Sequence, residues 1–235
     1  MKTFMDSGFV LKATPSGESN KHVVLLLKNH GKVVVTAKGA QAPKSKLAVV
    51  TQPFSCCEFK VYQGAGFLSL AEGVLLDNFF NISADYDRFQ TGCHILKLTD
   101  MMILPEMPAR AALALLYKSL KLLCEGNDHS LVRSVFELKL LQSEGYVPVT
   151  DSCADCGAAD SMTSIATTSM TFGASGLLCD GCAKGNPTVP IGEKCLQAIN
   201  YILGAKTKDA FSFDASPEIV SELAAAASFF LRGNV

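Results

Sequence analysis

The sequence predicts an α+β chain of several domains, with an N-terminal β-barrel followed by an α-helical domain into which a four-cysteine loop is inserted. Three observations lead to this fold class. Residues 1–80 show the alternation typical of strands, apolar residues recur at helical spacing from about residue 85, and Cys-x-x-Cys pairs begin at Cys153 and Cys179. We expect the barrel to span 1–80, the helical domain 81–149 and 189–235, and the inserted loop 150–188.

The barrel region contains about five short strand candidates. In Lys32–Lys38 the residues Val33, Val35 and Ala37 alternate with Lys32, Val34, Thr36 and Lys38, the period-2 pattern of a half-buried strand. The apolar run His22–Leu27 precedes it across Asn29-His30-Gly31, a sequence that favours a hairpin turn. The remaining candidates are Gly8–Lys12, Phe54–Tyr62 and Phe67–Leu76. Five short strands in eighty residues fit a small barrel of the OB type or a related antiparallel barrel.

Helical periodicity defines the second half of the chain. The expected helices are Asp85–Ile103, 108–126, His129–Ser143, Ile191–Leu203 and Pro217–Leu231. Their ends carry recognisable signals: Asp128 is a candidate N-cap, and Ser216-Pro217 is a typical helix start.

Composition indicates a globular chain with an uneven charge distribution. Of the 235 residues 49% are hydrophobic and 18% are charged, which excludes a disordered chain. Residues 1–60 hold nine lysines against Asp6, Glu18 and Glu58, a net charge of +6, whereas the overall net charge is −1. This asymmetry favours a face that binds a polyanion, although lysines that merely solvate exposed strand faces would give the same count.

The sequence shows no targeting or membrane segment. No run approaches the roughly 18 apolar residues that a membrane helix needs, and the start lacks the apolar core of a secretory signal. We therefore expect a cytoplasmic protein with no membrane partner. In a reducing compartment, its nine cysteines point to metal binding or free thiols before disulfides.

The four cysteines of the inserted loop are Cys153, Cys156, Cys179 and Cys182, spaced like the ligands of zinc ribbons. They predict one structural zinc ion, with iron left open. The linker between the pairs is mostly Ser, Thr, Ala and Gly and is expected to pack no core of its own, so a metal would supply its folding energy. A catalytic site is disfavoured because four thiolates fill the shell and no histidine lies within twenty residues of a ligand.

Outside this loop the sequence carries no recognisable catalytic pattern. It lacks a phosphate-binding P-loop, a Gly-x-Ser-x-Gly elbow and a His-Glu-x-x-His zinc motif, so we expect no enzyme. The other five cysteines are expected to be buried free thiols, namely Cys56, Cys57, Cys93, Cys124 and Cys195.

Three stretches of the chain share the pattern of a known family. The first runs through Gly8–Leu11, Gly17–Ser19, Gly31–Val33, Ala37–Ala40 and Lys44–Leu47, the second through Arg133–Leu141 and Gly145–Pro148, and the third is Cys153–Gly157. The most specific part is the succession of a basic helix, Gly-Tyr-x-Pro and Cys-x-x-Cys-Gly. In these residues the chain resembles the RecO family of bacterial recombination mediator proteins.

The resemblance implies an N-terminal OB-fold, a helical C-terminal domain and an embedded zinc-binding loop. It also implies a DNA repair role without bond-making activity: binding of single- and double-stranded DNA, annealing of complementary strands, and loading of RecA recombinase together with RecR and the single-stranded DNA-binding protein. The chain departs from the family where Gln41-Ala42-Pro43 replaces an expected basic run, which lowers the DNA contact expected from that loop.

Several side chains are candidates for these interactions. An OB barrel binds nucleic acid through a basic groove and stacking aromatics. Phe9, Phe59 and Tyr62 are candidate stacking residues, with barrel-core packing as the competing explanation. Arg133 is a candidate to pair with the acidic tail of the single-stranded DNA-binding protein, or else with Glu137 in its own helix. The lysines expected at DNA are Lys12, Lys21, Lys28, Lys32, Lys38, Lys44 and Lys46.

Two other functions compete with the mediator hypothesis. In the first, the chain is an adaptor whose barrel binds a partner protein and whose lysines only keep it in solution. In the second, which is the least favoured, the cysteine site serves a metal-dependent hydrolase.

Overall fold

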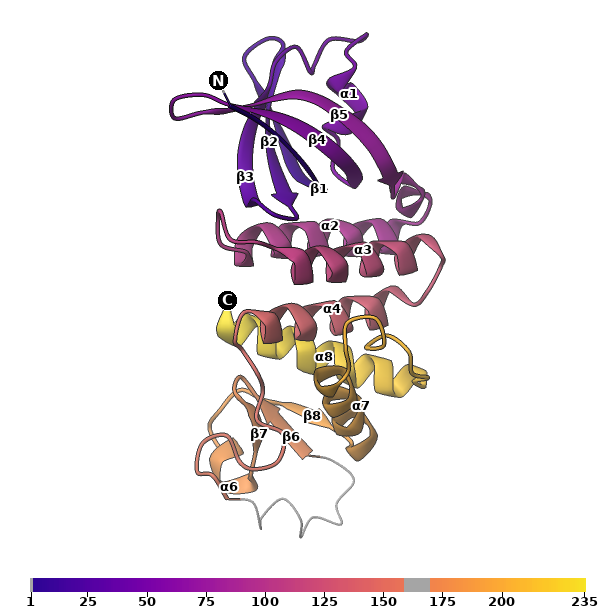
Figure 1. Ribbon diagram of the computed structural model, residues 1–235. Helices are drawn as coiled ribbons and strands as arrows, with labels where there is room; N and C mark the ends of the chain where they lie inside the picture. The colour runs from indigo at the N-terminus through magenta and orange to yellow at the C-terminus, as the bar shows by residue number, and fades with distance from the viewer. Residues whose placement is uncertain (1, 159–169) are drawn as a thin grey trace. The chain divides into compact units, whose positions relative to one another are not determined.

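The computed structural model describes residues 2–158 and 170–235 (Figure 1). The chain forms two compact units, Met1–Glu125 and Gly126–Val235. Part of the linker between the cysteine pairs, residues 159–169, lies outside the described residues.

The first unit is built on a closed barrel. Its strands are β1 (Lys2–Ser16), β2 (Asn20–Leu27), β3 (Gly31–Ala37), β4 (Ser55–Gln63) and β5 (Leu68–Asn78), in the order β1-β2-β3-β5-β4. All neighbours are antiparallel except β3 and β5, which pair in parallel at Thr36 and Ser69 alone. The predicted small barrel of about five strands is confirmed, and its assignment to the OB class stays a prediction.

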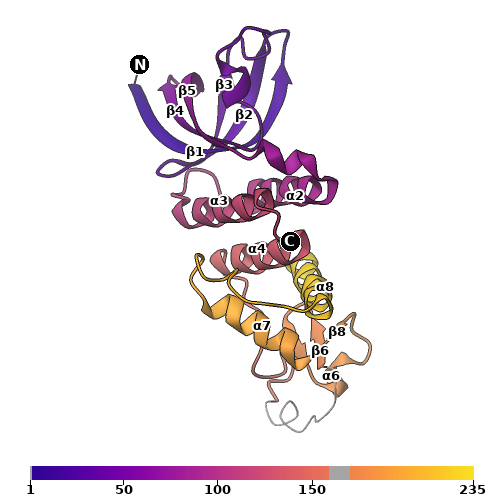
Figure 2. The same cartoon turned by 90° about the vertical axis from the view of Figure 1, so that its right-hand side faces the viewer.

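Strand β1 is much longer than its predicted range. Its first half pairs with β4 and its second half with β2, so that β1 curves along the barrel (Figure 2). The crossing occurs at Gly8, where a Cβ atom would lie 2.0 Å from the carbonyl oxygen of Leu26. Only glycine therefore permits this close approach.

The barrel core is formed by inward-facing side chains from every strand. Val10, Leu25, Val35, Phe59 and Leu70 are among its buried members. A short helix, α1 (Leu47–Val50), closes the core by placing Val50 against Gly73 of β5. The alternation seen in the sequence thus places one face of each strand in the barrel interior.

Two helices complete the first unit. After the 3-10 turn η1 (Phe80–Ala84) come α2 (Tyr86–Met102), capped by the Asp85 side chain, and α3 (Arg110–Cys124). Phe9 of β1 packs near Tyr117 of α3, with ring centroids 6.3 Å apart. The barrel and these two helices therefore form one compact unit, and the predicted domain boundary at residue 80 stays a prediction.

The second unit contains three longer helices, α4 (His129–Ser143), α7 (Glu193–Gly204) and α8 (Pro217–Asn234). All five predicted helices are confirmed, with ends within three residues of the predicted bounds. The predicted N-cap of α4 is also confirmed, because Asp128 accepts the N–H of Leu131 at 2.8 Å.

A small sheet carries the cysteine loop. Its strands are β6 (Met170–Gly173), β7 (Gly176–Leu178) and β8 (Val189–Ile191), in the order β7-β6-β8, and a short helix, α6 (Asp180–Ala183), follows β7. Phe172 and Leu177 are buried, and the ring of Phe172 lies 6.4 Å from that of Phe230 on α8. The expectation that the linker packs no core is therefore wrong for its C-terminal part.

None of the helices in the described ranges is both long enough and apolar enough to cross a membrane.

Candidate metal centre and nucleic-acid interface

Four cysteine sulfurs converge in the second unit. The Sγ atoms of Cys153, Cys156, Cys179 and Cys182 all lie within 4.8 Å of one another. The sulfurs of Cys156 and Cys179 are 3.8 Å apart. A tetrahedral ion with metal–sulfur bonds of about 2.3 Å would have sulfur–sulfur edges of about 3.8 Å. The cluster therefore fits a tetrahedral thiolate site.

The backbone around the cluster favours thiolate ligands. The backbone N–H groups of Cys156 and Cys179 point at the Sγ atom of Cys153, and the nitrogen of Cys179 lies 3.4 Å from it. These hydrogen bonds lower the pKa of the Cys153 thiol to about 6. Gly157, with φ +73°, turns the chain directly after the first pair. Thiolates are the metal-binding form of cysteine, so the backbone favours that form at Cys153. Hydrogen bonds with the other three cluster cysteines raise the pKa of the Cys182 thiol to about 12.

The composition of the cluster indicates a structural role. Among the described residues it contains cysteines alone, without a histidine or carboxylate. Four protein ligands fill a tetrahedral shell and leave no position for a substrate. An ion bound by these four sulfurs would connect β7 and α6 to the loop after α4.

The seven predicted lysines do not form a single face of the barrel. Lys38, Lys44 and Lys46 are exposed beyond the end of β3, and half-buried Lys21 at the start of β2 donates to Thr51. Exposed Lys28 lies past the other end of β2, about 20 Å away along the strand. Exposed Lys12 lies on β1, and half-buried Lys32 lies on β3. One end of the barrel thus gathers four of the seven.

Gln41 explains why the loop between β3 and α1 departs from a basic run. Its side-chain amide donates to the carbonyl of Asn20 at 2.6 Å and to that of Gly17 at 3.2 Å. Its backbone N–H donates to the carbonyl of Ser19. Gln41 therefore ties this loop to the β1–β2 turn and holds the three neighbouring lysines near that end of the barrel.

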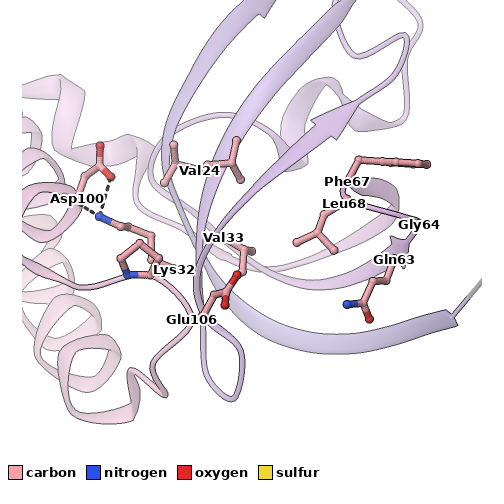
Figure 3. Close-up of a pocket in the computed structure, with 12 residues that line it drawn as sticks. Val24, Lys32, Val33, Gln63, Gly64, Phe67, Leu68, Asp100 and Glu106 are labelled. Atoms are coloured by element: carbon pink, nitrogen blue, oxygen red, sulfur yellow. Dashed lines mark hydrogen bonds and ion pairs between the residues drawn. The ribbon is translucent and has the colours of Figure 1, made fainter.

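An open groove of about 650 Å³ lies where the barrel seam between β3 and β5 is unpaired (Figure 3). Val24, Val34 and Phe67 give it apolar walls. Lys32 also lines it, but its ammonium lies 3.5 Å from the carboxylate of Asp100, and Glu106 adds a further acidic group. The groove therefore has apolar walls, and its charged lining residues, one lysine and two acids, give it no excess of positive charge.

The aromatic candidates divide by burial. Phe9 and Phe59 are fully buried, which supports core packing for both, while Tyr62 is exposed. Phe67, which was not among the candidates predicted from the sequence, is 51% exposed in the groove and packs over Gly64. The signal for it was the Gly64-Ala65-Gly66 bend directly before it.

Arg133 pairs with Glu137 of its own helix, which was the predicted alternative to contact with an acidic partner tail. Its Nε lies 2.7 Å from Oε1 of Glu137, whose side chain is only 1% exposed. Arg133 still borders a pocket of about 280 Å³ that Arg232 of α8 also lines. Two guanidinium groups, one of them paired with the Glu137 carboxylate that also lines the pocket, thus flank one concave surface within the second unit.

The five remaining cysteines are free thiols. Cys57 and Cys195 are buried as predicted, and burial raises the pKa of each thiol to about 12. Cys56 and Cys124 are half-buried, and Cys93 is exposed on α2, so the expectation of a buried thiol is wrong for Cys93.

Comparisons with known proteins give matches along nearly the whole chain. Residues 1–79 match the family model described as recombination protein O N terminal, and residues 83–235 match recombination protein O C terminal. A DNA repair protein RecO of Acetivibrio thermocellus is 30% identical over 236 residues, covering 99% of this chain and 92% of the relative. The relative of the same name from Caldicellulosiruptor bescii is 30% identical over 208 residues, covering 88% and 83%.

Proposed function

Because the chain belongs to the RecO family of DNA repair proteins, we propose that it is a recombination mediator that binds single- and double-stranded DNA and anneals complementary strands. The proposal rests on the match of residues 1–79 to the N-terminal and of residues 83–235 to the C-terminal recombination protein O model. In this role it has no bond-making activity of its own, and it acts in the cytoplasm at the nucleoid.

The barrel supplies the DNA-binding surface in this proposal. The exposed ammonium groups of Lys38, Lys44 and Lys46 lie on one loop, where they would contact successive phosphates. Lys21, Lys12, Lys28 and Lys32 contribute to a lesser extent, according to their burial and position. Bases would stack on Phe67 and Tyr62 at the barrel surface, since stacking accepts any base.

The second unit supplies a surface for partner proteins in this proposal. Arg133 and Arg232 flank a pocket suited to carboxylates, which fits the acidic C-terminal tail of the single-stranded DNA-binding protein. With RecR, the mediator would then help to load RecA onto the exposed strand. RecA itself is an indirect partner.

The four-cysteine cluster holds one structural zinc ion in this proposal. The thiolate set and its spacing suit zinc, which would supply folding energy to the small sheet and α6. Iron is the alternative for the same ligands, and elemental analysis of the purified chain distinguishes the two.

A second candidate function rests on the charge of the groove. Because Lys32 is paired with Asp100 and Glu106 lies nearby, the groove lacks the excess of positive charge that a polyanion prefers. This favours an adaptor whose barrel binds a protein segment, as the runner-up to the mediator.

A salt series separates the two functions. A labelled single-stranded oligonucleotide is titrated with the metal-loaded chain and with a Lys38→Glu, Lys44→Glu, Lys46→Glu variant, and binding is followed by fluorescence anisotropy. A mediator binds with an affinity that falls steeply with salt, and the variant reduces the slope by about 2, since each lost phosphate contact removes about 0.7. An adaptor shows no binding at low salt, and neither protein then accelerates annealing of complementary strands.

A further inference from the structure

A second groove in the first unit lies apart from Lys38, Lys44 and Lys46, and Lys12 is the one proposed DNA contact that also lines it. It has a volume of about 440 Å³ and lies between β1, α2 and the loop before β4. Leu11, Phe54 and Leu96 form an apolar floor in which each side chain is almost buried. Pockets of this size accommodate small ligands or a few anchoring side chains.

One face of α2 forms a wall of this groove. Cys93, Leu96, Lys97, Asp100 and Met101 follow the i, i+3, i+4, i+7, i+8 spacing of a single helix face. Met101 is 58% exposed although it is apolar. The helix therefore presents an apolar strip of Cys93, Leu96 and Met101 beside the floor, with Lys97 and Asp100 on the same face.

A β-bulge in β1 forms the opposite wall. The pairing register with β2 shifts between Val10 and Lys12, which leaves Leu11 as the extra residue. Val10 belongs to the barrel core, while Leu11 and Lys12 line the groove. Bulges re-aim side chains in this way.

The rim of the groove is positively charged. Lys12 and Lys97 are both exposed, and neither has an ion-pair partner in the part of the chain that the structure describes. The lining contains one acid, Asp100, and its carboxylate already pairs with Lys32. The groove thus combines an apolar floor with two available cations.

The floor does not suit nucleic acid. Single strands bind by stacking bases on aromatic faces, and the only aromatic residue of the lining, Phe54, is 7% exposed. Apolar side chains suit this floor better than bases do. The two lysines would at the same time attract carboxylates rather than other cations.

From these features we infer that the groove is a docking site for an acidic peptide segment of a partner protein, in which one or two large apolar side chains enter the floor and flanking carboxylates pair with Lys12 and Lys97. The site is separate from the proposed DNA contacts at Lys38–Lys46, so it stands whether or not the chain binds DNA.

The test uses the full metal-loaded chain and two labelled peptides. One peptide alternates aspartate with phenylalanine and leucine, and the other carries lysine at each aspartate position. We expect anisotropy to report binding of the acidic peptide only. Lys97→Glu should weaken it roughly five- to tenfold, since charge reversal removes an attraction and adds a repulsion. Met101→Glu should weaken it at least as much, because it places a like charge on the exposed apolar strip.

Two controls make the result specific to the groove. Lys2→Glu reverses an exposed lysine on the same strand as Lys12 but outside the groove, and should leave the affinity within twofold. The bound acidic peptide should also slow alkylation of the exposed Cys93 by iodoacetamide, followed by mass spectrometry.

Three outcomes would overturn the inference. The acidic peptide fails to bind the wild-type chain, or it binds the Lys97→Glu and Met101→Glu variants as tightly as the wild type. Alternatively, Lys97→Glu weakens binding of a single-stranded oligonucleotide but not of the peptide, which would make the groove a DNA surface. Urea unfolding of each variant confirms that the fold is intact, because both substituted side chains are exposed.

Discussion

Lys32 of β3 and Asp100 of α2 form an ion pair, with the ammonium 3.5 Å from the carboxylate. The same ammonium also donates to the backbone carbonyl of Asp100. Both groups are partly buried, so the pair is less screened by salt than a surface contact. Of the seven lysines predicted to contact DNA, Lys32 is therefore the one that pairs with a carboxylate among the residues that the structure describes.

This pairing predicts unequal effects of two lysine substitutions. Lys38→Ala should reduce the salt slope of oligonucleotide binding by about 0.7, as expected for one lost phosphate contact, whereas Lys32→Ala should leave the slope nearly unchanged. Asp100→Asn should raise the slope by up to about 0.7, because it frees the Lys32 ammonium. Equal loss of slope in both alanine variants would show that the ion pair opens in the complex.

Metal removal should unfold one part of the chain and spare the other. Chelation should make the four cluster thiols reactive toward a thiol reagent and raise hydrogen exchange in β6, β7 and α6, because the ligands hold these elements together. Hydrogen exchange in the barrel should not change. Cys153→Ser should reproduce both effects and lower the metal content.

The matched control for this experiment is Cys195→Ser, which changes a buried thiol outside the cluster. That variant should keep its full metal content even if it loses stability. Retention of the metal by Cys153→Ser would contradict a site built from all four cysteines.

The parts of the structure that were predictable from the sequence depend on local signals. The helix starts at Asp128 and Ser216-Pro217 are encoded within one turn, and both appear at the predicted positions. The cysteine pairs are likewise local, since two residues between thiols suffice to place both sulfurs on one ion. Local chemistry therefore predicts which thiols gather and where these two helices begin.

The parts that were not predictable depend on contacts between distant residues. Lys32 on β3 and Lys38 just after its end are an even number of residues apart, but only the fold places Asp100 beside Lys32, 68 residues later in the sequence. The first residues of β1 include the polar Thr3, Asp6 and Ser7, so the sequence pattern there does not predict a strand. Pairing with β4 stabilises the strand in the fold. Tertiary context overrides local preference in both cases.

Asp6 predicts a pH dependence of barrel stability. Its side chain is 1% exposed and accepts hydrogen bonds from the backbone and side chains of Asn29 and His30 at 2.7–3.1 Å. Burial alone would raise the pKa of the carboxyl, but hydrogen bonds from His30 and Asn29 outweigh it and hold the pKa below its usual 3.8. The β2–β3 turn thus depends on the charged form of Asp6.

The pKa of Asp6 is lower in the folded chain than in the unfolded chain, so the stability that its charged form contributes is fully present at pH values above the usual carboxyl pKa. This stability is lost as the pH falls through the lowered pKa of the folded state. At pH 7, Asp6→Asn should destabilise the barrel by about 2–3 kcal/mol, since several donors lose a charged acceptor. Hydrogen exchange of the β2 and β3 amides should be faster in the variant at pH 7, and the difference should shrink toward pH 3. A difference that grows on acidification would contradict this assignment.

The Arg133–Glu137 pair predicts that Arg133 contributes to both stability and partner binding. Arg133→Ala should destabilise the second unit by about 1–3 kcal/mol in urea unfolding, because it leaves a buried carboxylate with less compensation. Adding Glu137→Gln should recover part of this loss. Arg232→Ala, an exposed change in the same pocket, should cost less than about 0.5 kcal/mol yet also weaken binding of an acidic tail peptide.

Phe67 provides the most direct test of whether bases enter the seam between β3 and β5. Its ring is half exposed above Gly64 and carries no charge, so it can contribute to DNA affinity only through stacking. Phe67→Ala should weaken oligonucleotide binding by about 1–3 kcal/mol while leaving the salt slope unchanged, because no phosphate contact is lost. Phe67→Leu keeps an apolar side chain without a π-face and should lose most of the same affinity, whereas Phe67→Tyr should lose little. If all three variants bind as the wild type does, bases do not use this groove. The lysines beyond β3 would then hold the strand by its backbone alone, and the groove would be available to the protein partner of the adaptor hypothesis.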